Sequence, residues 1–396
     1  YRIVLIAFLF LLDNQGWLKS FYRTPANFLS VRNKDLDLFI NPVINFKLGK
    51  EQDAPNPVFQ NTRGIEIRGQ IDGKVYFYTS LFENQARFYN FIEDRIAQYQ
   101  SIPGQGFYKE YNSSVFESFQ GWDFANAEAY FGLPISKHIG LELGHSNHFI
   151  GNGYRSLLLN NYANNYFYLK LKVHVWKFHY QSIFAELASI SANLNPNNVL
   201  LSKKYMANHY LSYKPHRNFE IGLFETIVFS RPDHFEFQYL NPVILYRTAE
   251  YFLDSKDNVL IGINGKWNLF NQISLYGQLI LDEFNSSQFF AGNGWWANKY
   301  GIQMGMKYID VLGVDQLDAQ VELNFVRPFT YSHRDSLENF PTLSTANYCH
   351  HGQELAHPLG SNFVELILNI NYQPIQKLML QGKVMYAKKG NNTTSE

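Results

Sequence analysis

Residues 318–327 read DAQVELNFVR, and apolar and polar residues alternate through most of this stretch. Ala319, Val321, Leu323 and Phe325 occupy every second position, with polar residues between them. Successive side chains of a β-strand point to opposite faces, so such a strand has one apolar and one polar face. The stretch therefore predicts an amphipathic β-strand.

The same two-residue period recurs along most of the chain. At 166–175, for example, Phe167, Leu169, Leu171 and Val173 alternate with tyrosines and lysines. Alternation of this kind over four to eight residues is typical of strands. We predict fifteen strands, at 36–49, 62–71, 75–83, 123–133, 138–145, 165–173, 176–185, 205–212, 219–229, 259–267, 273–282, 300–310, 318–327, 362–372 and 378–388.

The connections between these strands fall into two alternating classes. The short class comprises 72–73, 133–137, 174–175, 212–218, 268–272, 311–316 and 373–376. The long class comprises 50–61, 84–122, 146–164, 186–204, 230–258, 283–299 and 328–361. Outer-membrane barrels have short periplasmic turns and long extracellular loops, whereas a soluble sandwich has no reason to sort its loops in this way. The predicted fold class is all-β: a transmembrane antiparallel β-barrel of 16–18 strands in the bacterial outer membrane.

Composition agrees with a barrel and excludes other classes. Aromatic residues and charged residues each make up 17% of the 396 residues, and an ordinary soluble chain is about a quarter charged. Equal numbers of basic and acidic residues, 34 each, and the lack of long basic runs argue against nucleic acid as a partner. The single cysteine excludes an internal disulfide. No apolar run approaches the 20 residues of a membrane-spanning helix.

Both ends of the chain predict a longer, exported protein. Residues 3–12 (IVLIAFLFLL) follow an arginine and have the length of a signal-peptide core, although a buried strand is the alternative. We assign 1–20 to a signal-peptide remnant and 21–396 to a barrel that lacks its C-terminal strands. An even strand number, normal for bacterial barrels, requires at least one strand after residue 396.

One helix is expected, at 84–98, within the second long connection. Phe88, Phe91, Ile92 and Ile96 fall at helical spacing there. We expect this apolar stripe to pack on the mouth of the barrel.

Four strings in or beside the long connections carry a family resemblance. They are GHSNHFIGNGYRSL at 144–157, FEFQYLNPV at 235–243, GWWANK at 294–299 and RPFTYSH at 327–333. They resemble the RemB-like gliding-motility outer-membrane proteins of the Bacteroidota, a group similar to the broader capsule-assembly (Wzi-type) family of outer-membrane β-barrels. The resemblance covers about residue 21 to the end. It implies a monomeric barrel that binds exported polysaccharide, or a surface role in gliding.

The residues in the long connections suit a sugar ligand. Sugar rings stack on Trp and Tyr, and their hydroxyls need paired donors and acceptors. The candidates, expected to converge at the extracellular mouth, are Arg87, His145, His148, Asn152, Arg155, Glu186, Glu236, Asp282, Glu283, Trp295, Trp296, Arg327, His333 and His357. The alternative is a polar plug in which Arg–carboxylate pairs pin folded loops inside the barrel. The two interpretations are compatible.

Catalytic and metal sites are weaker hypotheses. His145 and Ser146 would point to opposite faces of a strand, which argues against a hydrolase that needs both. His350 and His351 with His357 could bind a transition metal, and 254–258 could bind calcium, but neither has the spacing of a known site. We therefore predict no enzyme activity, no metal and no cofactor.

The sequence thus predicts a non-enzymatic outer-membrane barrel that binds or organises surface polysaccharide. The predicted partners are outer-membrane lipid, extracellular polysaccharide and other outer-membrane proteins. Inward charges of mixed sign argue against an ion-selective pore; they are expected at Glu66, Arg68, Glu142, Asp318, Glu322 and Glu365. A passive or nutrient porin and an accessory barrel of an export or assembly complex are the alternatives.

Overall fold

The computed structural model describes residues 27–390 except 53–55, 100, 114–118, 190–201, 232–235, 244, 254–256, 284–286, 288–289, 292–294, 296 and 334–345. The predicted signal-peptide remnant, at 1–20, and the polar residues 391–396 lie outside this part. No helix in the described part is long and apolar enough to cross a membrane. The chain divides into two compact units, which are described separately.

The first unit comprises residues 1–146 and 164–169. Its strands pair antiparallel in the order β1 (Leu29–Arg32), β2 (Leu36–Gly49), β3 (Val58–Ile71), β4 (Val75–Arg87), β6 (Gln120–Pro134) and β7 (Ile139–Ser146). Helix α2 (Asn90–Tyr99) and the short β5 (Lys109–Asn112), which also pairs with β6, lie in the connection between β4 and β6. Strand β8 (Tyr166–Val175) contains the boundary between the units.

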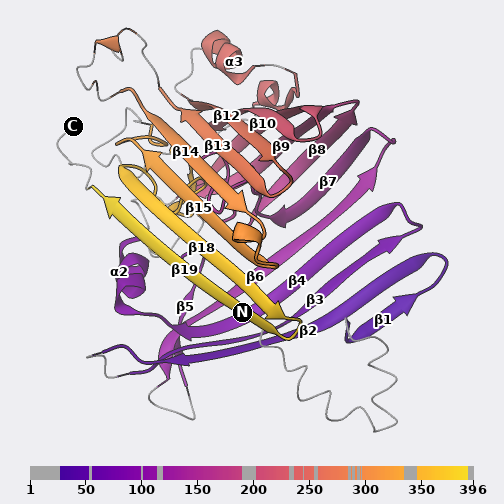
Figure 1. The fold of residues 1–396 in the computed structure, drawn as a ribbon, viewed down its shortest axis with the longest axis vertical. Coiled ribbons are helices and arrows are strands. Elements are labelled where there is room, and N and C mark those ends of the chain that lie inside the picture. Colours follow the sequence, from indigo (N-terminus) through magenta and orange to yellow (C-terminus); the bar gives the residue numbers. More distant parts are fainter. Residues whose placement is uncertain are drawn as a thin grey trace. The chain divides into compact units, whose positions relative to one another are not determined.

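The second unit comprises residues 147–163 and 170–396. Its antiparallel ladder runs in the order β9 (Phe178–Ser189), β10 (Ser202–His216), β11 (Phe219–Phe229), β12 (Asn258–Leu269), β13 (Ile273–Leu281), β14 (Tyr300–Tyr308), β15 (Leu317–Val326), β18 (Phe363–Ile375) and β19 (Leu378–Lys389). Strands β13, β14, β15, β18 and β19 run side by side in Figure 1, coloured orange to yellow. The connections contain η2 (Phe237–Leu240), α3 (Tyr246–Leu253), η3 (Val311–Gly313) and the hairpin β16 (Cys349–His350)–β17 (Gln353–Glu354).

Burial on these strands is the reverse of that in a soluble protein. On β15, the Glu322 and Asn324 side chains are fully buried, whereas Leu323 is 44% exposed and its apolar neighbours Val321 and Phe325 are also exposed. Water disfavours an uninterrupted apolar face of this size, but lipid does not. We call the two sides of the sheet the apolar face and the polar face. The alternation quoted at 318–325 is therefore the alternation of a membrane-facing strand.

All fifteen predicted strands are present, with boundaries that differ by at most four residues. The alternation of short and long connections is also confirmed, as in the two-residue turn between β10 and β11 and the 32-residue connection between β4 and β6. The prediction omitted the short strands β1, β5, β16 and β17, and the helices η2, α3 and η3. These elements are too short for a repeating pattern to identify them.

A helix and a turn in the prediction were misplaced. The helix expected at 84–98 begins at Asn90, because residues 84–87 still pair with β3 and β6 in the β4 ladder. The turn expected at 174–175 belongs to β8, and the chain reverses at Trp176, whose φ is 54°. In both cases strand pairing extends beyond the alternating pattern, because backbone hydrogen bonds do not depend on side-chain polarity.

One three-strand arrangement occurs in both units. In the first, Tyr76 lies over Gly132, and its hydroxyl donates to Glu142 at 2.8 Å. In the second, Tyr276 lies over Gly305, and its hydroxyl donates to Glu322 at 2.7 Å. Each tyrosine is directly opposite its glycine in the ladder, and each glycine is directly opposite its glutamate on the next strand. The arrangement lets each ring span one strand and satisfy a buried carboxylate on the polar face.

Candidate functional site

The segment 147–163 lies against the polar face of β13, β14 and β15 and is held there by Glu322. This carboxylate comes from the middle of β15 and is fully buried. It accepts hydrogen bonds from the backbone N–H groups of Tyr154 at 2.6 Å and Arg155 at 3.0 Å. The side chains that also donate to it are those of Tyr276, Gln303 and Asn324. One carboxylate therefore joins the strand wall to a loop more than 160 residues away in sequence.

A row of amide side chains on the same face continues the attachment of this loop. Gln278 accepts from the Leu157 N–H at 2.8 Å and donates to the Ile150 carbonyl at 3.1 Å. Gln303 donates to the Arg155 carbonyl at 3.0 Å. Gln278 has both its acceptor and its donor engaged, and a buried amide satisfied in this way stabilises one arrangement over its alternatives. The loop is thus fixed along its length.

Arg155 also reaches a buried acid–histidine pair. Its guanidinium lies 3.8 Å from Glu365, and the other oxygen of Glu365 lies 2.7 Å from His357 Nε2. His357 is fully buried, and this burial lowers its pKa although the neighbouring Glu365 acts in the opposite direction. These contacts match the predicted alternative of an arginine–carboxylate plug. They bring together two of the candidates, Arg155 and His357.

A second group of candidates meets where β13, β14 and β15 reach their long connections. Glu283 lies 3.4 Å from Lys299 Nζ and 3.8 Å from the His333 ring. Asp282 accepts from the Tyr331 N–H at 2.8 Å. The Arg327 guanidinium lies 5.5 Å from the centroid of the Tyr300 ring, in the same set of strand ends. Four predicted residues, Asp282, Glu283, Arg327 and His333, are therefore gathered at these ends.

Asp282 has an unusual protonation equilibrium. Burial raises its pKa to about 7, and Lys299 only partly offsets this effect. Its Oδ1 atom is buried and accepts no hydrogen bond from any described residue. Because a buried carboxylate without enough donors favours its neutral form, Asp282 changes charge near neutral pH.

Glu236 belongs to a third group, built on Arg231. Arg231 makes two 2.7 Å hydrogen bonds to the two oxygens of Asp257, and its Nε lies 4.0 Å from Glu236. The Tyr239 hydroxyl also donates to Asp257 at 2.7 Å. Asp257 was part of the calcium hypothesis, and the structure shows it engaged by these donors instead.

Arg87 and His145 lie on the apolar face of the first unit. Arg87 is the last residue of β4, opposite Phe59, while its neighbour Ala86 is buried on the polar face. His145 is exposed on the same face as Leu143, whereas Ser146 points to the polar face and donates to Glu128 at 2.7 Å. The expected separation of His145 and Ser146 is present. A ligand-binding role for Arg87 and His145 stays a prediction.

The remaining candidates are dispersed. His148 is buried and Asn152 partly buried in the segment 147–163, and Trp295 is 40% exposed beyond β13. Glu186 makes a 2.8 Å ion pair with Lys203 on the surface. Trp296 lies outside the described residues. Within the described part, no three His, Cys, Asp or Glu side chains are grouped so as to hold a metal ion.

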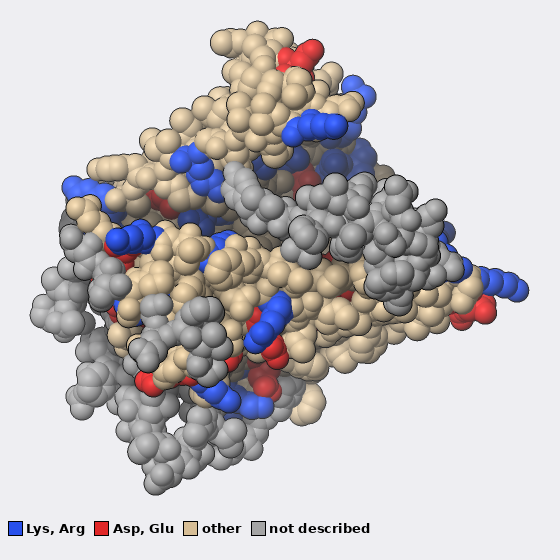
Figure 2. Space-filling model, turned by 90° about the horizontal axis from the view of Figure 1, so that it is seen from below, with Lys and Arg blue, Asp and Glu red and all other residues tan. Residues whose placement is uncertain are grey.

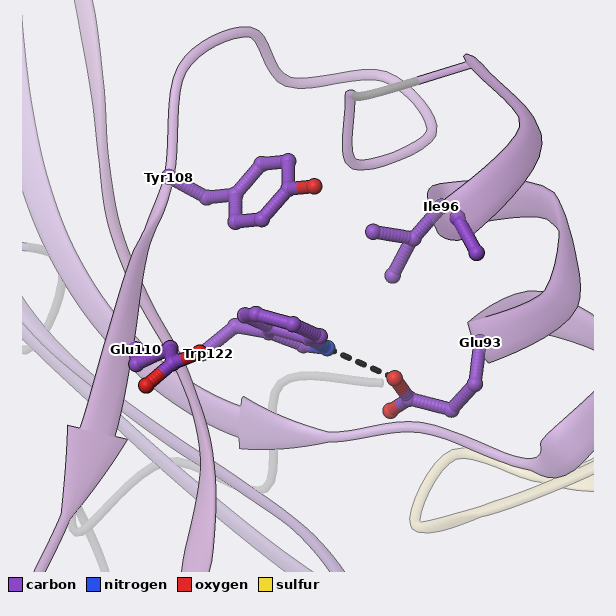
Figure 3. A pocket seen from close by; sticks show the side chains of 6 residues that line it. Glu93, Ile96, Tyr108, Glu110 and Trp122 are labelled. Atoms are coloured by element: carbon purple, nitrogen blue, oxygen red, sulfur yellow. Dashed lines mark hydrogen bonds between the residues drawn. The ribbon is translucent and has the colours of Figure 1, made fainter.

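A pocket in the first unit contains none of the predicted residues. It is lined by Glu93, Ile96, Ala97, Tyr108, Glu110 and Trp122, from α2, β5, β6 and the segment between them, and has a volume of about 390 Å³ (Figure 3). The Tyr108 and Trp122 rings meet edge to face with centroids 4.8 Å apart. Glu93 fixes the indole by accepting from Trp122 Nε1 at 2.7 Å, and its other oxygen accepts from the Phe88 N–H at 2.8 Å.

The local sequence explains how this pocket forms. Ile96 and Ile92 of α2 pack on Ala86 and Phe124 of the polar face, which fixes the helix beside the strand ends. Trp122 shares that face with Phe124, because the two are separated by one residue in a strand. The Tyr108 hydroxyl makes no hydrogen bond to a described residue and remains available to a ligand. Helical spacing predicted α2, but no periodic signal identified Tyr108 or Trp122.

Comparison with known proteins now gives the family. Residues 56–395 match the family model of the capsule assembly protein Wzi. Among solved structures, the fold is similar to that of Wzi from Escherichia coli, described as a carbohydrate-binding outer-membrane β-barrel involved in group 1 capsule assembly. That likeness has a TM-score of 0.56 at 14% identity and covers 90% of this chain and 71% of that one.

Other similarities are weaker. A mutant porin of Rhodopseudomonas blastica has a TM-score of 0.40 at 7% identity, covering 88% of this chain and 94% of the porin. Pseudomonas aeruginosa OpdK with vanillate has a TM-score of 0.40 at 12% identity, covering 90% and 94%. Scores this low support no conclusion about the chain, and no curated protein matches its sequence. The family match over most of the chain and the shared fold establish that this chain belongs to the family of the capsule assembly protein Wzi and is an outer-membrane β-barrel.

Proposed function

We propose that this barrel binds and organises surface polysaccharide at its long-loop end and catalyses no reaction. The observation that carries the proposal is the pocket beside α2, where two aromatic rings, an unengaged tyrosine hydroxyl and an exposed carboxylate line one cavity. Ring faces stack on the CH faces of sugars, and polar groups at the rim select hydroxyl positions. The volume, about 390 Å³, lies within the range of roughly 300–1,000 Å³ for ligand pockets.

The charges of the pocket specify the type of sugar. Glu93 and Glu110 line it, and no Lys or Arg is among its lining residues. A carboxylate lining repels a uronic acid and attracts an amino group. We expect neutral or amino-substituted sugars to bind more tightly than acidic ones.

Charge elsewhere agrees with an uncharged or weakly charged ligand. Figure 2 shows basic and acidic side chains interspersed, with wide uncharged stretches between them. That face lacks the single-sign surface, among its coloured residues, on which a polyanion would bind. A nucleic-acid partner is therefore not proposed.

The absence of catalysis rests on the engagement of the reactive groups. Ser146 donates to Glu128, and the buried His357 is paired with Glu365. Neither arrangement places a serine beside a histidine, as the Ser–His–acid array of a hydrolase requires. The alternative of a passive porin is disfavoured by the loop that Glu322 fixes on the polar face, which in a barrel is the lumenal face.

Some expectations drawn from the sequence remain predictions. They are the origin in Bacteroidota, the gliding role, the signal peptide, the additional C-terminal strands and a role as an accessory barrel beside other outer-membrane proteins. The Wzi family membership supports capsule assembly more directly than gliding.

The test is a binding measurement on the purified, folded protein. An array of neutral, amino-substituted and acidic oligosaccharides is probed with the wild type, Trp122→Ala and Trp267→Ala. Trp267 is an exposed tryptophan of β12 on the apolar face, so its removal is a matched control. We expect Trp122→Ala to bind at least about tenfold more weakly than the wild type, because the loss of about 1.4 kcal/mol of stacking corresponds to a factor of ten in affinity. Trp267→Ala should bind as the wild type does. Equal binding by all three proteins would exclude the pocket as the glycan-binding site. No binding of any oligosaccharide by the wild type would refute the proposed function.

A further inference from the structure

Helix α3 covers the apolar face of its sheet, not the polar face. Leu211, Leu223 and Ile263 are opposite one another in the ladder of β10, β11 and β12, and all three are exposed on the apolar face. Side chains two residues apart share a face. Ile227, four residues after Leu223, is therefore on the same face, yet it is fully buried.

The cover over Ile227 consists of residues from 237–253. Tyr239 of η2 and Tyr246 and Ala249 of α3 pack in one cluster with Ile227 and Ala207 of the strands. The segment therefore folds over the outside of the wall at the long-loop ends of β10–β12. In Figure 1, α3 lies beyond the ends of these strands.

Polar contacts show that this position is specific. Glu225 lies on the apolar face, between Leu223 and Ile227, and accepts from the Arg247 N–H of α3 at 3.2 Å. Tyr180, also on this face, donates to the Pro242 carbonyl at 2.5 Å. A carboxylate that faces lipid without a hydrogen-bond partner destabilises the barrel. The cost is smaller when a helix covers the carboxylate and donates a hydrogen bond to it. The cover gives Glu225 a polar partner at the edge of the apolar band.

The outer surface of the same segment is itself apolar. Phe237, Val243, Leu245 and Phe252 are exposed, Phe252 by 74%. Leu245, which immediately precedes α3, and Phe252 are seven residues apart and lie at one edge of the apolar side of the helix, next to Tyr246 and Ala249, which contact the wall. Arg247 and Glu250 pair at 2.8 Å on the opposite, polar side of the helix. The apolar side of α3 is therefore wider than its contact with the wall, and the part of it at Leu245 and Phe252 is exposed.

We propose that the η2–α3 segment lies in the outer leaflet of the outer membrane, with Phe237, Val243, Leu245 and Phe252 in contact with lipid acyl chains. The occupant is lipid because the segment sits on the lipid-facing side of the wall, directly beyond the exposed Leu223 and Ile263. The segment continues an apolar surface that already contacts lipid. Irregular backbone is not tolerated deep in the hydrocarbon, so the segment lies at the membrane interface with its polar flank toward water.

Spin-label accessibility in liposomes tests this placement. Leu245→Cys and Phe252→Cys are made in a Cys349→Ala background, labelled with a nitroxide and reconstituted in phosphatidylcholine–phosphatidylglycerol vesicles. Leu223→Cys is the lipid-facing control. Arg247→Cys, on the same helix, and Asp315→Cys, in the exposed connection before β15, are the aqueous controls. Heat-modifiable gel migration verifies that each variant is folded.

The expected result is an oxygen-to-nickel-chelate accessibility ratio at Leu245 and Phe252 that matches Leu223 and is severalfold higher than at Arg247. If the accessibility ratio at both positions matches the ratio at Arg247 and Asp315, this apolar surface faces water in the vesicles. That outcome overturns the proposal and favours a protein partner for the surface. Should Phe252→Cys not fold, Val243→Cys provides the same comparison. The result is independent of glycan binding, because no sugar is present.

Discussion

The Tyr276 hydroxyl donates a 2.7 Å hydrogen bond to Glu322 across the width of β14, and the residue beneath its ring is Gly305. A Cβ atom at position 305 would lie 2.1 Å from the ring carbon that bears the hydroxyl. The glycine is thus required for close approach of the ring. Since Glu322 also holds the backbone of Tyr154 and Arg155, this contact links the wall to the loop on the lumenal face.

Gly305→Ala should displace the Tyr276 ring and break its bond to Glu322. We expect a loss of about 1–3 kcal/mol in the free energy of unfolding, the usual effect of overpacking and of losing a buried hydrogen bond. Gly265→Ala in β12, which pairs with β13, the strand of Tyr276, is the control, because no atom lies within 4 Å of its added Cβ. Urea titration followed by heat-modifiable gel migration measures both variants. An equal effect of the two substitutions would contradict the role of Gly305.

Glu322→Ala should release the segment 147–163 from the wall. Each buried donor that loses its acceptor costs about 1–3 kcal/mol, so the loop should detach before the barrel unfolds. In a planar bilayer we expect steady ion conductance from the variant and none from the wild type. Asp318→Ala, on the same face of β15 nearer the short turn, should remain closed. A closed Glu322→Ala barrel that resists protease within 147–163 would show that other contacts hold the loop.

Asp282 should make stability depend on pH. Its pKa in the folded state is raised to about 7 from an ordinary value of 3.8. A raised folded-state pKa favours folding below pH 4, and this contribution is lost as the pH rises through about 7. The free energy of unfolding of the wild type relative to Asp282→Asn should therefore fall between pH 4 and pH 8. A difference that stays constant over this window would contradict the assignment, and Asp315→Asn, in an exposed turn, serves as the control.

Leu323→Arg should test which face of β15 contacts lipid. Leu323 is exposed between the buried Glu322 and Asn324. An arginine on the lipid face near mid-membrane costs roughly 2–4 kcal/mol, and much less near the interface. We expect a large loss of folded fraction on insertion into vesicles, and little effect from Asp315→Arg. Tolerance of arginine at position 323 would place that face in water.

The sequence by itself determined the strands and the sorting of their connections. A strand in lipid needs a complete apolar face and a polar face, so the alternation at 318–325 indicated both its structure and its environment. The strings at 144–157 and 327–333 pointed to the correct family, and they contain residues that hold loops in place, such as Arg155 and Tyr331.

Only the tertiary structure decided which face of the sheet each long connection packs against. Helix α2 packs on the polar face through Ile96, whereas α3 packs on the apolar face through Tyr246. The difference depends on strand register, which places Phe124 on one face and Ile227 on the other. Local spacing cannot encode this, because a one-residue shift in pairing exchanges the two faces.

The candidate site could also be predicted only in part from the sequence. The sequence identified Asp282, Glu283, Arg327 and His333, which meet because adjacent antiparallel strands bring alternate connections to one end. It did not assign Glu322 a partner, because its donors at Tyr154 and Arg155 lie more than 160 residues away. A buried carboxylate needs donors close in space, and only the folded chain, with its register fixed, brings them together.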